Sequence, residues 1–157
     1  MIAHSRFALA SLALLALGAC QTPGANAPAT PAPSANLAGT AWRLVEFQSM
    51  DDAQGTARPD DRAKYTLRFG ADGRVAARLD CNRGMGPWQG AVTGADGGSL
   101  AIGPLATTKM LCPAPSMGDM LGVQLGYVRS YLIRDGRLAM SLMADGGIIV
   151  WERIPAR

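Results

Sequence analysis

The sequence predicts a mainly β fold, a small antiparallel β-barrel-like domain of about eight strands with one α-helix. Three observations support this prediction. Short segments alternate between polar and apolar residues and are separated by turns rich in glycine and aspartate. Only one segment has the three- and four-residue spacing of an amphipathic helix. The length of 157 residues leaves room for a single hydrophobic core.

Residues 1–19 have the pattern of a lipoprotein signal peptide. Arg6 supplies the positive charge, and a mainly apolar run extends from Phe7 to Leu17. This run has the length of a signal-peptide hydrophobic region and falls short of the roughly 20 apolar residues that span a bilayer. Leu17 to Cys20 resembles the lipobox that lipoprotein signal peptidase cleaves. We therefore expect diacylglycerol and N-acyl lipid on Cys20, and no other cofactor.

Residues 20–36 are predicted to be a tether. They contain mostly Ala, Pro, Thr, Ser, Gly and Asn, without a charge or an aromatic ring, so they cannot form a core. Their proline content predicts a semi-extended chain that reaches on the order of 50 Å. Gln21, where some lipoproteins have Asp, favours the outer membrane. We expect a lipid-anchored envelope protein whose domain, residues 37–157, faces the periplasm.

Residues 64–69 and 74–79 are predicted to form a β-hairpin. Residues 70–73, with the sequence Gly-Ala-Asp-Gly, supply the turn between them. Each strand places three apolar residues on one face, which are Tyr65, Leu67 and Phe69 in the first and Val75, Ala77 and Leu79 in the second.

The other strands are shorter or lie near the C-terminus. Residues 131–133, 138–142 and 148–151 are predicted to form a three-stranded meander, with turns at Asp135-Gly136 and at residues 145–147. Three less regular strands complete the set of about eight, at 42–47, 87–92 and 100–102. A sheet of this kind removes its exposed edges by closing into a barrel.

One segment is predicted to be helical. Ser116 and Asp119 resemble a capping box, while Gly122 and Gly126 each weaken a helix by about 1 kcal/mol relative to alanine. Packing against the open end or flank of the sheet must therefore stabilise this helix. Its apolar face comprises Met117, Met120, Leu121, Leu125 and Val128.

The residue inventory excludes several classes of function. The only histidine is His4, which lies in the predicted signal peptide, so the mature chain lacks histidine catalysts and histidine metal ligands. Removal of Arg6 leaves 14 Lys and Arg against 12 Asp and Glu, a dispersed net charge of +2 that does not favour nucleic acid. The two glutamates, Glu46 and Glu152, lie in no acid/base motif. We expect no enzyme activity and no metal site.

Cys81 and Cys112 are predicted to form a disulfide, because pairing is the default in an oxidising compartment. Such a bond closes a loop of about 32 residues and stabilises the domain by about 3–4 kcal/mol in the chain-entropy model. The alternative is a redox or metal-binding pair, which the wide spacing and the adjacent Pro113 disfavour. A thioether copper site near Met110 is a further alternative, although methionine more often fills a core.

If the two cysteines are bonded, four polar residues should lie close to them, and they form a candidate polar patch. Two interpretations are open. The patch binds a ligand, or its members satisfy backbone groups at strand ends, as such residues usually do. Trp42, Trp88 and Trp151 could likewise pack in the barrel or stack on a ligand, and their positions in strand patterns favour packing. The four patch residues are Asn82, Arg83, Thr107 and Thr108.

Several short motifs follow one another along the chain: a G-T-x-W opening at 39–42, a C-N-R at 81–83 and a T-x-M-x-C at 108–112. They lie within the segments 37–44, 73–75, 81–83, 105–112, 138–142 and 148–151. Taken in order, these segments resemble the META domain family, which includes HslJ-like heat-shock proteins of bacteria. The resemblance implies a β-barrel-like fold with a helix, and an association with envelope stress, heat shock or antibiotic tolerance. The chain departs from the family at Asp80, where Gly is usual, at Leu111, where Ala is commoner, and in a long polar loop at 48–63.

The sequence therefore predicts a non-enzymatic lipoprotein that binds or scaffolds an envelope partner, either a protein or a small ligand. Two alternatives remain. The first is an inhibitor of lysozyme-type enzymes, which would insert an exposed loop such as 48–63 into the enzyme cleft. The second is a carrier that holds a small apolar ligand in the mouth of the barrel.

Overall fold

The computed structural model of the chain describes residues 36–156. The predicted signal peptide, Cys20 and nearly all of the predicted tether lie outside the described residues. The described residues form one compact unit. Within residues 36–156, no helix has the length and hydrophobicity needed to cross a membrane.

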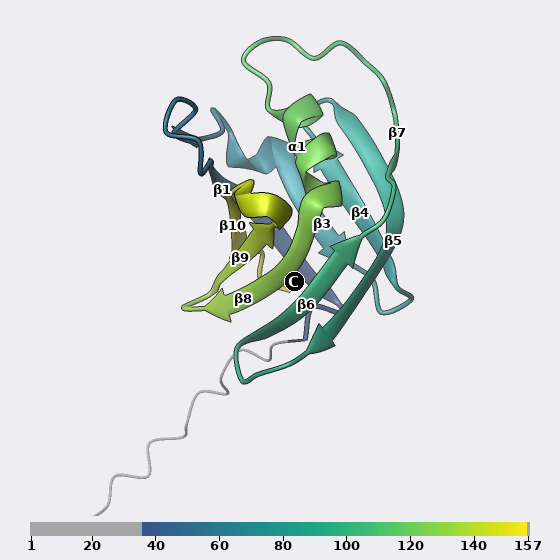
Figure 1. Cartoon of the computed structure of the whole chain (residues 1–157). Helices are drawn as coiled ribbons and strands as arrows, with labels where there is room; N and C mark the ends of the chain where they lie inside the picture. The colour runs from purple at the N-terminus through teal and green to yellow at the C-terminus, as the bar shows by residue number, and fades with distance from the viewer. Residues whose placement is uncertain (1–35, 157) are drawn as a thin grey trace, which may run out of the picture. The chain divides into compact units, whose positions relative to one another are not determined.

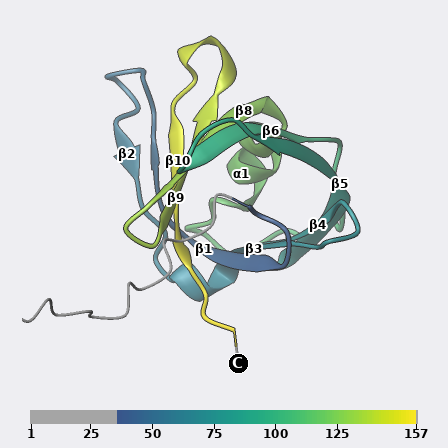
Figure 2. The same cartoon turned by 90° about the horizontal axis from the view of Figure 1, so that it is seen from below.

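Eight antiparallel strands form a closed barrel, which confirms the predicted fold class (Figures 1 and 2). They follow the chain order around the ring, and the last strand pairs with the first. The strands are β1 (Thr40–Gln48), β3 (Tyr65–Phe69), β4 (Arg74–Leu79), β5 (Asn82–Val92), β6 (Gly97–Ile102), β8 (Val128–Arg134), β9 (Arg137–Leu142) and β10 (Ile148–Arg153).

Two short strands lie beside this ring. β2 (Thr56–Ala57) pairs with the end of β1, and β7 (Ala106–Thr107) pairs with β5. The predicted polar loop at 48–63 therefore contains β2 and also the start of a 3₁₀ turn, η1 (Arg62–Lys64). The side chain of Asp61 caps this turn by accepting a hydrogen bond from the backbone N–H of Ala63 at 2.8 Å.

Alternation along the strands places apolar side chains inside the barrel. The faces predicted for the β3–β4 hairpin are the buried ones, with Leu67 and Val75 fully enclosed. Trp42 and Trp151 are also fully buried, and the indole N–H of Trp42 donates to the hydroxyl of Thr40 at 2.7 Å. Trp88 is half-buried and stands edge-on to Phe69. The prediction that the three tryptophans are packing residues is confirmed.

The helix is shorter than predicted. α1 (Gly118–Gln124) is followed by a 3₁₀ turn, η2 (Leu125–Tyr127), and Val128 already belongs to β8. The prediction that Val128 lies on the helix was wrong, because this residue pairs with Leu142 in the neighbouring strand and adopts an extended conformation. Gly126 lies in the 3₁₀ turn, where the helical period ends.

The predicted capping box is also absent. Met117 occupies the N-cap position without a side-chain hydrogen bond, and the Ser116 hydroxyl accepts from the backbone N–H of Gly118 at 3.2 Å. The phenolic oxygen of Tyr65 accepts from the backbone N–H of Met117 at 2.9 Å. Tertiary contact with β3 thus replaces the local cap. α1 lies across one end of the barrel, with Leu121 and Leu125 fully buried (Figure 2).

The packing of α1 against Leu79 of β4 generates a prediction about two glycines. A Cβ on Gly118 would stand 2.7 Å from the carbonyl oxygen of Leu79, whereas a Cβ on Gly122 would meet only the Leu79 side chain at 3.5 Å. We expect Gly122→Ala to raise the free energy of unfolding by about 0.5–1 kcal/mol, and Gly118→Ala to lower it by about 1–3 kcal/mol. Urea denaturation measures both changes. Equal effects of the two substitutions would contradict this packing.

Candidate functional site

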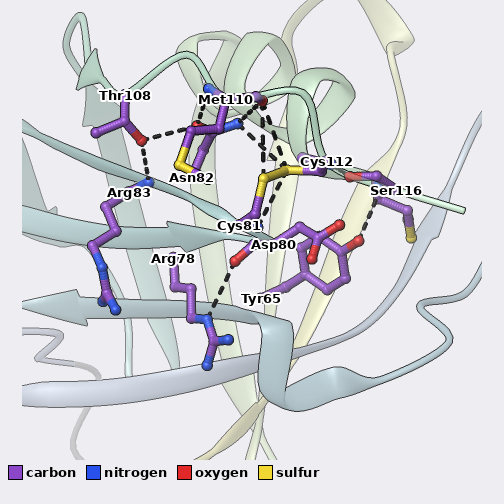
Figure 3. Close-up of a disulfide and its surroundings, with 12 residues drawn as sticks. Tyr65, Arg78, Asp80, Cys81, Asn82, Arg83, Thr108, Met110, Cys112 and Ser116 are labelled. Carbon is purple, nitrogen blue, oxygen red and sulfur yellow. Dashed lines mark hydrogen bonds between the residues drawn. A yellow bond between two sulfur atoms is a disulfide. The ribbon is translucent and has the colours of Figure 1, made fainter. Parts of the chain in front are cut away.

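Cys81 and Cys112 form the predicted disulfide, with their Cα atoms 5.6 Å apart (Figure 3). The bond joins the start of β5 to the segment that leads into α1. Asp80, which precedes the bond, has a φ of 62°, a left-handed conformation that glycine adopts readily and aspartate tolerates. The buried Oδ2 of Asp80 has no hydrogen-bond partner among the described residues.

Asn82 holds the segment after β7 against the barrel. Its side-chain oxygen accepts from the backbone N–H of Met110 at 2.8 Å, and its amide nitrogen donates to the carbonyl of Met110 at 2.9 Å. Asn82 is buried, so this pair of bonds replaces water at both the side chain and the backbone. The amide acts as a substitute for one rung of a β-ladder.

The remaining patch residues separate into two groups. The Thr108 hydroxyl donates to the Asn82 oxygen at 2.9 Å and accepts from the backbone N–H of Arg83 at 3.0 Å. Thr107 pairs with Gly84 through its backbone, and the exposed Arg83 side chain points away from Asn82 (Figure 3). The structure therefore brings Asn82 and Thr108 together to satisfy backbone groups, and Arg83 belongs to a different surface.

A small pocket of about 160 Å³ lies between this segment and α1. Its polar lining includes Asn82, Thr107, Thr108, Lys109 and Asp119. The polar atoms of Asn82 and Thr108 already form hydrogen bonds with each other and with the backbone. Little of this lining is therefore free to bind a ligand.

A larger groove of about 470 Å³ lies at the same end of the barrel, between the loop after β1, the end of α1 and the β9–β10 turn. Tyr127 and Met143 are 45% and 43% exposed, so the groove offers apolar surface to solvent. Its lining includes Phe47, Asp51, Gln54, Tyr127, Met143 and Asp145.

One turn that lines the groove has a strained backbone. The turn η3 (Met143–Asp145) holds both Ala144 and Asp145 at positive φ, 51° and 53°. Non-glycine residues in this conformation cost of order 1 kcal/mol each and gather at functional sites. Arg129 donates to the sulfur of Met143 at 3.0 Å. This bond links β8 to the turn that lines the groove.

The sequence does not predict this groove. Its walls come from loops that are far apart in the chain. The sequence of each loop, taken alone, is typical of an ordinary polar turn. Met143 is the one local signal, because it is a large apolar residue that follows the last inward position of β9 and has no place in the strand alternation.

The two glutamates lie in ion pairs on the outside of the barrel. The hydrogen bond from Gln48 lowers the pKa of Glu46 against the opposing effect of burial, and the Arg58 charge lowers it further. Burial raises the pKa of Glu152, but the hydrogen bond and charge of Arg43 outweigh it, so this pKa is also lowered. Both groups favour the ionised form at neutral pH. Among residues 36–156, no three His, Cys, Asp or Glu side chains gather as a metal site.

A family model described as the META domain matches residues 35–153. No curated protein matches the chain significantly. The fold resembles the NMR structure of a protein from Burkholderia xenovorans, with a TM-score of 0.57 and 22% identity, covering 87% of this chain and 99% of that one. It also resembles the crystal structure of a DUF4847 family protein from Bacteroides vulgatus, with a TM-score of 0.54 and 15% identity, covering 77% and 96%. At these identities the likeness concerns the fold alone.

The hydrogen bonds of Asn82 generate a prediction about stability. Asn82→Ala leaves the backbone N–H and C=O of Met110 without their partner, so we expect the free energy of unfolding to fall by about 2–4 kcal/mol. Thr107→Ala is the matched control because the Thr107 side chain makes no hydrogen bond within the described chain, and it should change stability by about 0.5 kcal/mol or less. Chemical denaturation measures both. Equal losses would show that Asn82 is not the residue that holds the segment.

Proposed function

Because this chain belongs to the META domain family, we propose that it is a non-enzymatic, periplasm-facing lipoprotein that binds or scaffolds a partner during envelope stress, heat shock or antibiotic exposure. The groove beside α1 is the observation that carries this proposal. It is an accessible, partly apolar surface whose shape is maintained by a strained turn. The proposed partner is an envelope protein or ligand that fits this groove.

The absence of enzyme activity is supported by the chemistry of the acidic and polar groups. Glu46 and Glu152 are held ionised in ion pairs, which suits neither to act as a general acid. Asn82 and Thr108 are engaged in holding the chain.

The position of the groove agrees with a lipid anchor at Cys20. The described chain begins at Asn36, four residues before Thr40 at the start of β1, and the groove is lined by Phe47 and Ser49 at the other end of that strand. A strand of nine residues spans about 30 Å. An anchor before β1 would therefore join the domain at the end opposite the groove, which would leave the groove accessible to partners in the periplasm.

The anchor has its own test. We expect protein purified from its native membrane to begin at Cys20 with an attached diacylglycerol and N-acyl chain, because residues 17–20 resemble a lipobox. Intact-mass and N-terminal peptide analysis measure this. A chain that retains residues 1–19 without acylation would exclude the lipoprotein proposal.

The groove combines apolar surface with negative charge. Tyr127 and Met143 supply apolar contact, and the carboxylates of Asp51 and Asp145 lie in the same lining. This combination favours a segment with an apolar side chain next to a basic or hydrogen-bonding group.

A complementation experiment tests the groove. In a strain that lacks the gene, we expect the wild-type chain to restore survival of heat and antibiotic stress, and Tyr127→Ser with Met143→Ser to fail. The reason is that these substitutions remove the exposed apolar surface of the groove but leave the core intact. Survival after graded stress is the measurement, with immunoblots to compare protein levels.

Leu132→Ser is the matched control, because Leu132 is a similarly exposed apolar residue (41%) on β8 outside the groove lining. It should complement fully. Full complementation by the groove variant would overturn the assignment of binding to this groove, and a strain without any stress phenotype would overturn the stress role.

An inhibitor of lysozyme-type enzymes remains the second candidate, because the loop between β1 and β3 is acidic. Asp51, Asp52, Asp60 and Asp61 are exposed there, which suits contact with the surface of a basic enzyme. Unchanged lysozyme activity at micromolar protein would exclude it. The carrier alternative has less support, because large buried side chains such as Trp42, Trp151 and Tyr65 occupy the barrel interior.

A further inference from the structure

One outer face of the barrel concentrates positive charge, and we call it the arginine face. It covers the outward positions of the adjacent strands β3, β4 and β5, and none of these positions is acidic. Its members are Thr66, Arg68, Arg74, Ala76, Arg78, Arg83, Met85 and Pro87.

Most of these arginines have no anionic partner. The side chains of Arg68, Arg74 and Arg83 make no ion pair or hydrogen bond with any described residue, and Arg78 donates only to the carbonyl oxygens of Ala63 and Asp80. The neighbouring strands β1 and β10 differ, because there an arginine has an anionic partner: Arg43 of β1 pairs with Glu152 of β10 at 2.6 Å.

The register places like charges directly beside one another. Arg78 lies opposite Arg83 across the β4–β5 ladder, and Arg68 lies opposite Ala76, between Arg74 and Arg78 in the next strand. Like charges at opposite positions destabilise a sheet. An anionic surface laid against this face would relieve the repulsion.

The arginine face is hollowed next to the point where the chain enters the domain. A shallow groove of about 300 Å³ is lined by Arg68, Arg74 and Met85 together with Gly39 to Ala41. Asp72 is the one carboxylate in this lining, and it accepts the backbone N–H of Arg74 at 3.1 Å. Met85 is 47% exposed, so an apolar side chain stands among the cations.

We propose that the arginine face is a docking surface for anionic phospholipid. Guanidinium groups bind phosphate oxygens in bidentate geometry, while the arginine stems, Met85 and Pro87 suit the apolar part of the interface. The inference builds on the proposed lipid anchor at Cys20, only 19 positions before Gly39 in the chain. A tether of that length keeps the face at a high local concentration near the bilayer.

Vesicle binding tests this proposal without the anchor. The chain from residue 21 to 157 keeps the whole compact unit and lacks both Cys20 and the signal segment. We expect it to float with vesicles of equimolar phosphatidylglycerol and phosphatidylcholine but not with pure phosphatidylcholine, and to be released by salt. Each arginine near an anionic surface contributes about fivefold, so Arg68→Gln with Arg74→Gln should weaken binding by about 25-fold.

Two further variants serve as controls. Arg134→Gln with Arg137→Gln removes the same charge from the β8–β9 hairpin, where Asp96 pairs with Arg134, and should bind as the wild type does. Arg68→Lys with Arg74→Lys keeps the charge but loses the bidentate guanidinium geometry, so its binding should lie between that of the wild type and that of the glutamine variant. Circular dichroism verifies that each variant is folded.

Three results would overturn the proposal: no binding to anionic vesicles, equal binding to neutral ones, or equal weakening by both glutamine pairs, which would indicate attraction by net charge alone. An unacylated native protein would instead overturn the anchor while leaving this vesicle result intact, so the two failures are distinguishable.

Discussion

Pairing between β1 and β10 is the interaction on which the rest of the structure depends. Arg43 and Glu152 are 109 residues apart in the chain, yet their strands are adjacent and their side chains form an ion pair. This pairing converts an open sheet into a ring, so within residues 36–156 the eight barrel strands each have a partner on both sides. It also encloses Trp42 and Trp151 completely. Without it, both the core and the two ends of the barrel would be undefined.

A closed barrel still needs its ends covered, and here the covering segment is a weak helix. α1 has only seven residues, and no side chain caps its N-terminus. The Cys81–Cys112 bond, the Asn82 amide and the Tyr65 hydroxyl hold the chain before it, so the helix is positioned by tertiary contacts instead of its own propensity. The residues that the sequence suggests as a polar site therefore hold the chain in place at the end of the barrel that α1 covers.

The two ends of the barrel differ in chemistry. The end that carries α1 has a groove with exposed Tyr127 and Met143 and nearby carboxylates, whereas the arginine face borders the end where the chain enters at Gly39. An anchor at Cys20 would bring the basic surface to the bilayer and leave the groove free. Anchoring, orientation and partner binding would then be three consequences of one asymmetry in charge and exposed apolar surface.

The sequence alone was enough for the strands of the barrel and for the inward faces of the β3–β4 hairpin, because the period of two is a local property of the chain. The pairing of Cys81 with Cys112 also followed from inventory and compartment. Tertiary structure decided the rest. Val128 lies in β8 and not in the helix because it pairs with Leu142 in β9. Asn82 holds the segment after β7 because its side chain bonds the backbone of Met110. The groove is lined by segments that are distant in the chain, and the arginine face depends on the register between consecutive strands, which the pattern of a single strand does not contain.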